Sequence, residues 1–453
     1  MSARTHRVTG ASDDRALRWA AAACALAIGA LVAGCGSGTP SRHRGGTLEV
    51  MAVWTGTEQR NFSRVIAGFE SATGASVSYT AAPAGVPAAL DARLAAHNPP
   101  DVAFLPQPGA LRRYASEGAL VPLDPPTRRN VDRNYSAAWL DLASVAGRPF
   151  GVWFKAADKS LVWYNVGAFE NAGVVPPTTI DGLVHVARTL TSTGVPAFSV
   201  GGANPWTLDD WFANLYLRVA GPARYDLLAA HRLAWTDESV KGTLRLMSQV
   251  LSPGALAGGP VGALGMSFSS SVAALASDPP GAAMTSEAEF VLGALPPDAA
   301  VEPGRDIDVF PFPSVAPAEP GVAAPAVAAA PSGVVAGGDV AVALRATPLA
   351  AAFLAYLATP DAAARWASQG GFISPNANLD LAVYPDDLTR SVARSVLEAG
   401  DALRFGMADL QPPSFGANQA AGMQGELRAF LLTRDVDATA SRLEQAARAA
   451  YRP

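Results

Sequence analysis

The sequence predicts an α/β protein built from two lobes. Its 453 residues exceed what one hydrophobic core normally organises, so at least two folding units are expected. Strand-like runs at 47–54, 76–80 and 101–105 alternate with helical segments, an order typical of a doubly wound lobe. From about residue 176 to residue 290 the pattern is mainly helical, which indicates a second lobe.

The first strand and helix have the clearest signals. The run "TLEVMAVW" at 47–54 is apolar on both faces apart from Glu49, which favours a buried parallel strand. Thr55 and Glu58 then have the spacing of a capping box, which would make Glu58 a helix-capping residue. A helix with one apolar face is expected to follow and to end at Gly74.

Further elements divide the chain between the lobes. Short strands are expected at 150–154 and 161–164, and "DIDVFPFP" and "GVVAGGDVAVAL" return to strand character. A Pro/Ala loop occupies 321–333, and two helices begin at Thr347-Pro348 and Thr359-Pro360. We expect an N-terminal lobe of residues 47–156 and about 305–345, and a C-terminal lobe of residues 157–304 and about 346–453.

Residues 1–34 have the features of a targeting segment. Four arginines precede an apolar run from about Trp19 to Ala33, which is short for a membrane span. The run closes on Val-Ala-Gly-Cys35, which resembles a bacterial lipobox and implies lipidation of Cys35, with residues 35–46 as a flexible tether. The alternative is an ordinary signal peptide or a weak membrane helix with a chance cysteine.

Composition excludes several functions. A net charge of −5 without a basic stripe argues against nucleic-acid binding. The chain has no H-E-x-x-H, no C-x-x-C and no phosphate loop, so no metal, cofactor or catalytic residue is predicted. A pair of carboxylates acting as a glycosidase stays open, because their separation in space is not readable from the sequence.

Aromatic and polar residues together indicate a sugar site. A pyranose ring offers a face of C–H groups for an aromatic ring and a rim of hydroxyls for polar side chains. Trp54 follows the first strand, where open α/β sheets bind ligands. The predicted ligand-binding residues are Trp54, Glu58, Gln107, Trp153, Lys155, Asp158, Trp206, Asp210, Glu287, Phe290, Asp339 and Phe415. For each tryptophan the alternative is core packing.

The order of motifs resembles the extracellular solute-binding protein family 1, the carbohydrate-binding lipoproteins of bacterial ABC importers, in its actinobacterial type. The resemblance is carried by "FESATGASVSYT", "NPPDVAFLPQPG", "GRPFGVWFKAADKSLVWYN", "FENAGVVPPTTIDGL", "PPGAAMTSEAEF" and "GGFISPNANLD", which span about 400 residues. It implies a two-lobe periplasmic-binding-protein-like fold with a hinge and an interlobe ligand cleft. It also implies a non-enzymatic, exported receptor, expected to be monomeric, that meets an ABC permease at the outer face of the cell membrane.

Residue roles implied by the resemblance are specific. Asp158 precedes the crossing strand "VWYN" where an acidic ligand contact occurs in the family, and Trp206 and Phe290 occupy places of sugar-stacking aromatics. Phe415 matches a late aromatic contact. Asp339 stands where many members have tryptophan, so hydrogen bonding is expected there instead of stacking.

Two other functions remain open. A receptor of the same fold could bind a polyamine, a metal chelate or a glycerol phosphodiester. A phosphate-bearing ligand would require basic residues in the cleft, and Lys155, Lys159 and Arg112 are the candidates. An anchored glycosidase would require two carboxylates facing each other across the sugar.

Overall fold

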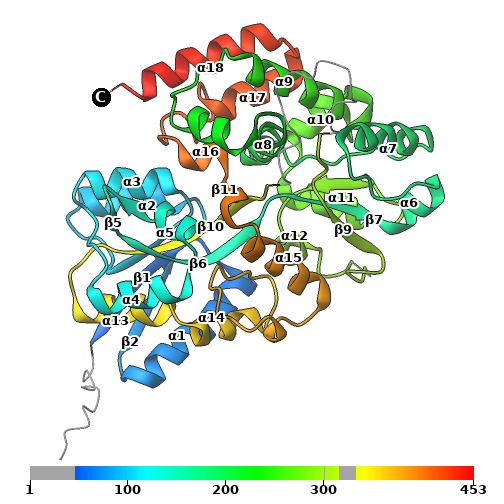
Figure 1. The fold of residues 1–453 in the computed structure, drawn as a ribbon. Helices are drawn as coiled ribbons and strands as arrows, with labels where there is room; N and C mark the ends of the chain where they lie inside the picture. The colour runs from blue at the N-terminus through cyan, green and yellow to red at the C-terminus, as the bar shows by residue number, and fades with distance from the viewer. Residues whose placement is uncertain (1–45, 300, 316–332, 453) are drawn as a thin grey trace, which may run out of the picture. The chain divides into compact units, whose positions relative to one another are not determined.

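The computed structural model describes residues 46–299, 301–315 and 333–452 (Figure 1). The predicted lipidation site Cys35 and nearly all of the predicted tether and Pro/Ala loop lie outside these ranges.

The first lobe is organised by a six-stranded sheet. Strand β1 (Thr47–Ala52) lies between β2 (Ser76–Ala81) and β3 (Val102–Leu105) and is parallel to both, and β1 and β3 are almost wholly buried, as the sequence predicts. The long strand β10 (Val335–Ala343) runs antiparallel between β3 and β6 (Gly151–Asp158). The short β11 (Arg404–Phe405) pairs with the beginning of β10.

The second lobe contains a three-stranded antiparallel sheet. Strand β7 (Leu161–Asn165) lies between β8 (Met284–Ser286) and β9 (Ile307–Pro311). Alternate residues of β7 face opposite sides: Trp163 joins the hydrophobic core of the first lobe, whereas Val162 joins that of the second. This sheet therefore connects the two cores. A separate hairpin is formed by β4 (Ser144–Val145) and β5 (Arg148–Pro149).

Helices surround both sheets (Figure 1). Those packed with the first sheet are α1 (Gly56–Thr73), α2 (Val86–Ala95), α3 (Pro108–Ser116), α4 (Pro125–Asn134), α5 (Ala137–Leu142), α13 (Pro348–Leu357), α14 (Pro360–Ala367) and α15 (Asp387–Glu398). Those around the second sheet are α6 (Val166–Ala172), α7 (Ile180–Ser192), α8 (Trp206–Ala229), α9 (Glu238–Val250), α10 (Gly259–Gly265), α16 (Met407–Leu410), α17 (Met423–Thr433) and α18 (Val436–Ala450). Helix α11 (Phe268–Ala276) packs on β7 and β8, and α12 (Val291–Ala294) packs on α11, although their buried residues Val272, Leu275 and Val291 belong to the first core. Short 3₁₀ helices span Pro253–Ala255, Leu381–Val383 and Gly400–Ala402.

Several predicted helix ends are confirmed by their caps. The Thr347 and Thr359 side chains accept hydrogen bonds from the backbone N–H groups of Ala350 and Ala362, and a proline follows each threonine. Helix α1 ends at Gly74, whose φ of 74° is the left-handed conformation that glycine adopts without strain. The predicted capping box is wrong, because the Thr55 side chain makes no capping bond and Glu58 binds a lysine instead.

The lobe boundaries differ from the expected ones. Residues 346–403 were expected in the C-terminal lobe, but the buried faces of α13, α14 and α15 belong to the core of the first sheet. Residues 307–311 were expected in the N-terminal lobe, but they form an edge strand of the second sheet. Only the segment from Met407 onward returns to the second core.

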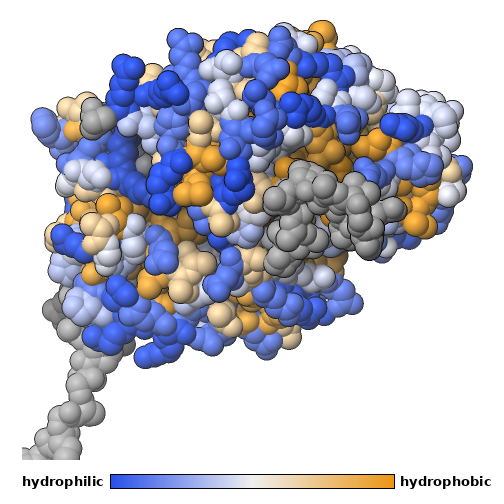
Figure 2. All heavy atoms as spheres, turned by 45° about the horizontal axis from the view of Figure 1, so that its top comes forward, coloured by the Kyte–Doolittle hydropathy of each residue, from blue (hydrophilic) through white to orange (hydrophobic). Residues whose placement is uncertain are grey.

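Hydrophilic residues cover most of the face in Figure 2, with small hydrophobic groups between them. Within the described residues, no single helix is both long and apolar enough to cross a membrane. Helices α10 and α11 meet the length and composition criteria only as a pair bent by 116°.

Candidate functional site

A pocket of about 720 Å³ lies at the carboxyl end of β1, which is where open α/β sheets place their ligands. Its walls come from both lobes. The first lobe contributes the turn after β1, the first turn of α1, and residues of β6, β10 and α14. The second contributes the beginnings of α8 and α11 and the α12 region. Six predicted site residues line it: Trp54, Glu58, Lys155, Trp206, Phe290 and Asp339.

Three aromatic rings form the second-lobe wall of the pocket. Trp206 begins α8, Phe268 begins α11 and Phe290 precedes α12. Their ring centroids lie 5.4 to 5.8 Å apart, and all three side chains are only half-buried. These three residues, named here the aromatic trio, offer apolar faces to a molecule in the pocket.

A lysine and two carboxylates form part of the opposite wall. Lys155 Nζ on β6 lies 2.5 Å from the Glu58 Oε1 atom on α1. Asp339 is paired with Lys155 in the β6–β10 ladder and is 8% exposed. Burial raises the pKa of Asp339 to about 6, against the opposing attraction of Lys155. Together with the aromatic trio, this wall gives the pocket polar groups facing apolar ones.

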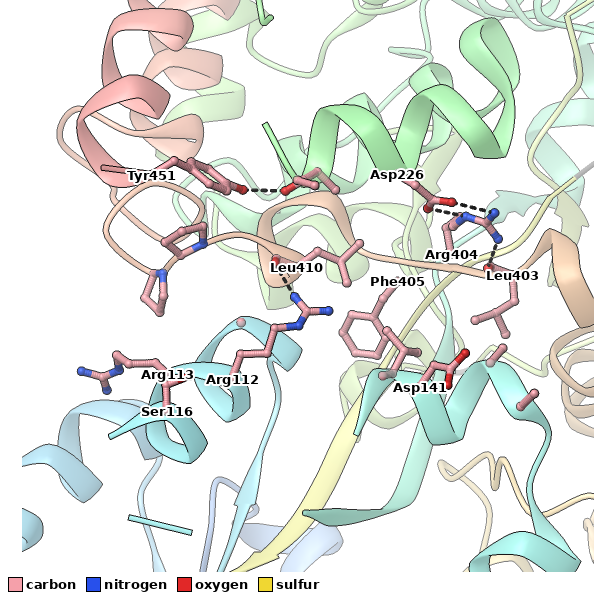
Figure 3. A pocket seen from close by; sticks show the side chains of 18 of the residues that line it. Arg112, Arg113, Ser116, Asp141, Asp226, Leu403, Arg404, Phe405, Leu410 and Tyr451 are labelled. Carbon is pink, nitrogen blue, oxygen red and sulfur yellow. Dashed lines mark hydrogen bonds and ion pairs between the residues drawn. The ribbon is translucent and has the colours of Figure 1, made fainter. Parts of the chain in front are cut away.

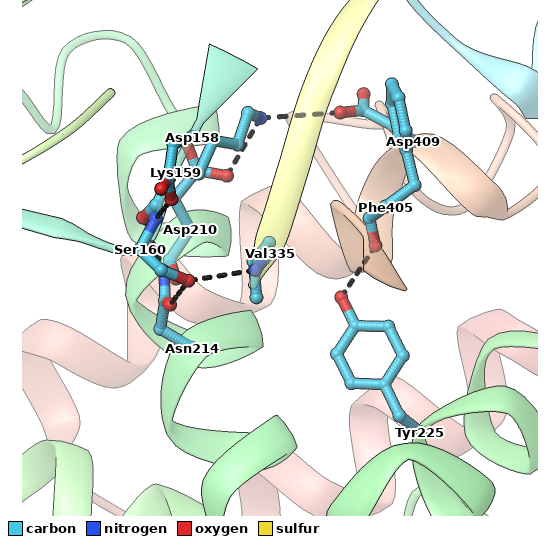
Figure 4. Close-up of polar contacts among 9 residues, drawn as sticks. All are labelled: Asp158, Lys159, Ser160, Asp210, Asn214, Tyr225, Val335, Phe405 and Asp409. Carbon is cyan, nitrogen blue, oxygen red and sulfur yellow. Dashed lines mark hydrogen bonds and ion pairs between the residues drawn. The ribbon is translucent and has the colours of Figure 1, made fainter. Parts of the chain in front are cut away.

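A second polar group lies where the chain crosses between the lobes (Figure 4). Lys159, between β6 and β7, donates to Asp210 of α8 at 2.9 Å and approaches Asp409 of α16 at 3.5 Å. The neighbouring Ser160 hydroxyl bonds to Asn214 and accepts from the backbone N–H of Val335. These contacts tie α8 and α16 to the crossing strands.

Carboxylates outnumber cations around Lys159. Burial raises the pKa of Asp210 to about 6, although Lys159 favours its charged form. Burial also raises the pKa of Glu287 well above its ordinary value, and the charge of Asp210 adds to the rise. Among the described residues, Asp210 Oδ2 and Glu287 Oε2 are buried and accept no hydrogen bond. The predicted residues Asp210 and Glu287 therefore lie together, in this group beside the crossing strands.

Asp158 faces a different set of neighbours. Its carboxylate accepts from the Ser160 backbone N–H at 2.9 Å and from the Ser395 hydroxyl of α15. Its own backbone N–H donates to Glu289, whose pKa burial raises to about 7. The structure thus places Asp158 in contacts within the protein and outside the lining of the pocket.

Three predicted residues lie apart from the pocket. Trp153 is 2% exposed and packs on Trp139 and Phe405, with ring centroids 5.4 and 5.0 Å away. Phe415 is fully buried against Trp235. Gln107 is half-buried at the beginning of α3 and lines neither of the two large pockets. For Trp153 and Phe415 the structure shows core packing, the alternative that the sequence left open for tryptophans.

The pocket also has lining residues that the sequence analysis did not predict, among them two aromatic ones. Phe268 completes the aromatic trio, and Trp366 of α14 lies under Lys155, whose Nζ is 5.3 Å from its ring centroid. No motif marks Phe268, since it stands in a run of serines. Trp366 lies on the apolar face of an amphipathic helix, a position that predicts packing in the hydrophobic core.

A larger cavity of about 1100 Å³ lies between α3 and α5 on one side and α8, β11 and the 410–414 segment on the other (Figure 3). Arg112 points toward its centre and donates to the Leu410 carbonyl oxygen at 2.8 Å. Arg404 pairs with Asp226 at 2.7 Å. None of the twelve predicted binding residues lines this cavity.

Two α/β lobes and a pocket walled by both lobes are the architecture of a receptor that encloses a small solute. The chain belongs to the family of bacterial extracellular solute-binding proteins, whose model matches residues 54–364. It is therefore an exported solute receptor of the ABC-importer type and not an enzyme. No group of three or more His, Cys, Asp or Glu within the described residues is placed to hold a metal ion.

Two curated relatives cover most of the chain. The osmoprotective compounds-binding protein GgtB of Synechocystis is 33% identical over 82% of this chain and 85% of its own length. The alpha-glucosides-binding periplasmic protein AglE of Rhizobium meliloti is 30% identical over 83% of this chain and 81% of its own.

The fold is shared with solved receptors of lower sequence identity. The bacterial solute receptor AcbH superposes with a TM-score of 0.76 at 18% identity, over 90% of this chain and all of that one. This likeness supports the two-lobe assignment.

Proposed function

We propose that this protein captures a sugar or short oligosaccharide between its lobes and delivers it to the membrane permease of an ABC importer. The observation that carries the proposal is the pocket itself, in which the aromatic trio faces the Glu58, Lys155 and Asp339 side chains. A pyranose offers C–H faces to such rings and hydroxyl groups to such carboxylates. A relative named for alpha-glucosides supports this ligand class.

Hinge closure around the sugar supplies the signal to the permease. Contacts from both lobes form together only when the lobes enclose the ligand, so binding favours the closed state. Reversing a 99:1 preference for the open state requires about 5.5 kcal/mol of differential binding, and contacts from two lobes can supply it.

The ligand class is tested by a thermal-shift screen of the protein lacking residues 1–35. The panel holds sucrose, trehalose, maltose and maltotriose, with spermidine and glycerophosphoethanolamine for the alternative solutes. We expect one neutral sugar to raise the melting temperature, because a ligand at 100 times its Kd stabilises the folded state by about 2.7 kcal/mol. Chromatography of the mixture should return the sugar unchanged. A shift with the charged solutes alone, or hydrolysis of the sugar, would overturn the proposal.

We further propose that the mature protein is a monomer anchored through lipid on Cys35. The support is the lipobox-like Val-Ala-Gly-Cys sequence after an apolar run. Two acyl chains are sufficient for stable anchoring. We expect the wild type in the membrane fraction and the Cys35→Ala variant outside it. Equal membrane recovery of both forms would contradict the anchor. Light scattering of the form lacking residues 1–35 checks the monomer.

A further inference from the structure

Charge in the pocket is unbalanced toward acid. Among its lining residues Lys155 is the one base, whereas Glu58, Asp339 and Asp386 are acidic. Lys155 already forms an ion pair, because its ammonium lies 2.5 Å from Glu58, and its side chain is only 8% exposed. Asp386 caps α15, where its two carboxylate oxygens accept hydrogen bonds from the backbone N–H and the hydroxyl of Thr389, and it also lines the pocket.

The other candidate cations are also occupied or remote. Lys159 is paired with Asp210 and Asp409, at 2.9 and 3.5 Å. Arg112 lines the other cavity and donates there to the Leu410 carbonyl oxygen. No described residue therefore offers the pocket a cation without a carboxylate partner.

An anion entering this pocket meets two costs. It loses its water, and it approaches carboxylates in a partly dehydrated space where charge repulsion is stronger than in water. A neutral hydroxyl group is attracted instead of repelled, because it donates a hydrogen bond to the same carboxylates. The carboxylates that line the pocket therefore favour a neutral hydroxyl group over an anion.

We propose that the pocket selects its ligands by charge, accepting uncharged polyhydroxylated molecules and excluding those that carry a carboxylate or phosphate. This inference rests on the proposed function and narrows its ligand class. It excludes the glycerol phosphodiester that the sequence left open. It also assigns specificity to Glu58 and Asp339, in addition to the sugar contacts that the proposed function gives them.

The test compares matched pairs by isothermal titration calorimetry. The pairs are trehalose with trehalose 6-phosphate, sucrose with sucrose 6-phosphate, and maltose with maltobionate. For each neutral sugar that binds, we expect the anionic partner to bind at least about 100-fold more weakly, which corresponds to ~2.7 kcal/mol. Affinities within threefold of each other would overturn the inference and leave the proposed function standing.

Variants assign the discrimination to the pocket. Glu58→Gln keeps the size of the side chain and removes one negative charge beside Lys155. The anionic sugar should then bind only about 10-fold more weakly than its neutral partner, or less, and this ratio of Kd values is called here the anion penalty. Asp132→Asn is the matched control, since Asp132 lies on α4, pairs with Arg128 at 2.6 Å and lines neither pocket. It removes the same charge and should leave the anion penalty unchanged.

The outcomes separate the two proposals. If Asp132→Asn narrows the anion penalty as much as Glu58→Gln does, net charge and not the pocket is responsible, and the inference is wrong. If a neutral sugar does not bind but its anionic partner does, the inference fails, whereas the proposed function stands because the bound molecule is still a sugar. Melting temperatures near that of the wild type establish that each variant is folded.

Discussion

Replacing Lys159 by methionine should destabilise the protein by about 3 kcal/mol. The change leaves Asp210 and Asp409 without the ammonium that now lies 2.9 and 3.5 Å away. The Asp210 side chain is 4% exposed, so it cannot recover the lost interaction from water. Breaking a buried ion pair on one side costs more than the pair contributes, because the remaining charge stays buried.

Differential scanning calorimetry of the protein lacking residues 1–35 measures the Lys159→Met effect. The double variant Lys159→Met/Asp210→Asn removes the stranded charge and should recover part of the loss. Lys241→Met is the control, since Lys241 pairs with the exposed Asp437 on the protein surface and should change the melting temperature little. If Lys159→Met is as stable as Lys241→Met, the buried contacts of Lys159 with Asp210 and Asp409 do not stabilise the fold.

The beginning of the first lobe was predictable in detail because its signals are local. A buried strand, an amphipathic helix and a glycine stop follow one another from Thr47 to Gly74, and each depends on neighbours in the sequence. The Thr-Pro helix beginnings at 347 and 359 are local for the same reason. The sheet against which those helices pack is not local. It depends on β10 and β11 returning to the first lobe, and this is why residues 346–403 were assigned to the wrong side.

The site was predictable only in part for a related reason. Trp54 and Glu58 follow β1, so their position at the pocket follows from the strand itself. Trp153 and Phe415 have equally suggestive surroundings in sequence, yet the structure buries both rings among other aromatics. The Trp54 ring is also only 1% exposed and packs on Phe104 and Trp366, so Trp54 lines the pocket as part of the first core. Lys159 was considered only as a possible contact for phosphate. Its carboxylate partners are 51 and 250 residues away, so their approach is visible only in three dimensions.

Removing the Trp206 ring should produce the largest loss of ligand affinity among the pocket variants. Trp206 is half-buried at the beginning of α8 and is in contact with Phe268 and Phe290, so its free face is held in place by two neighbours. Burying an apolar ring face contributes about 1.5–3 kcal/mol, and each 1.4 kcal/mol is a factor of ten in Kd. We therefore expect Trp206→Ala to weaken binding of the sugar found in the screen by about 10- to 100-fold.

Two comparisons separate stacking from packing. Trp206→Phe keeps a flat ring and should retain affinity within about fivefold, whereas Leu432→Ala changes an exposed residue that does not line the pocket and should have no effect. Without sugar, the melting temperature of Trp206→Ala should stay close to that of the wild type, because the ring is only half-buried in the unliganded protein. The rise in melting temperature that sugar produces should become clearly smaller in the variant. If Trp206→Ala lowers that melting temperature strongly but binds sugar normally, the aromatic trio is part of the second core and the sugar lies elsewhere between the lobes.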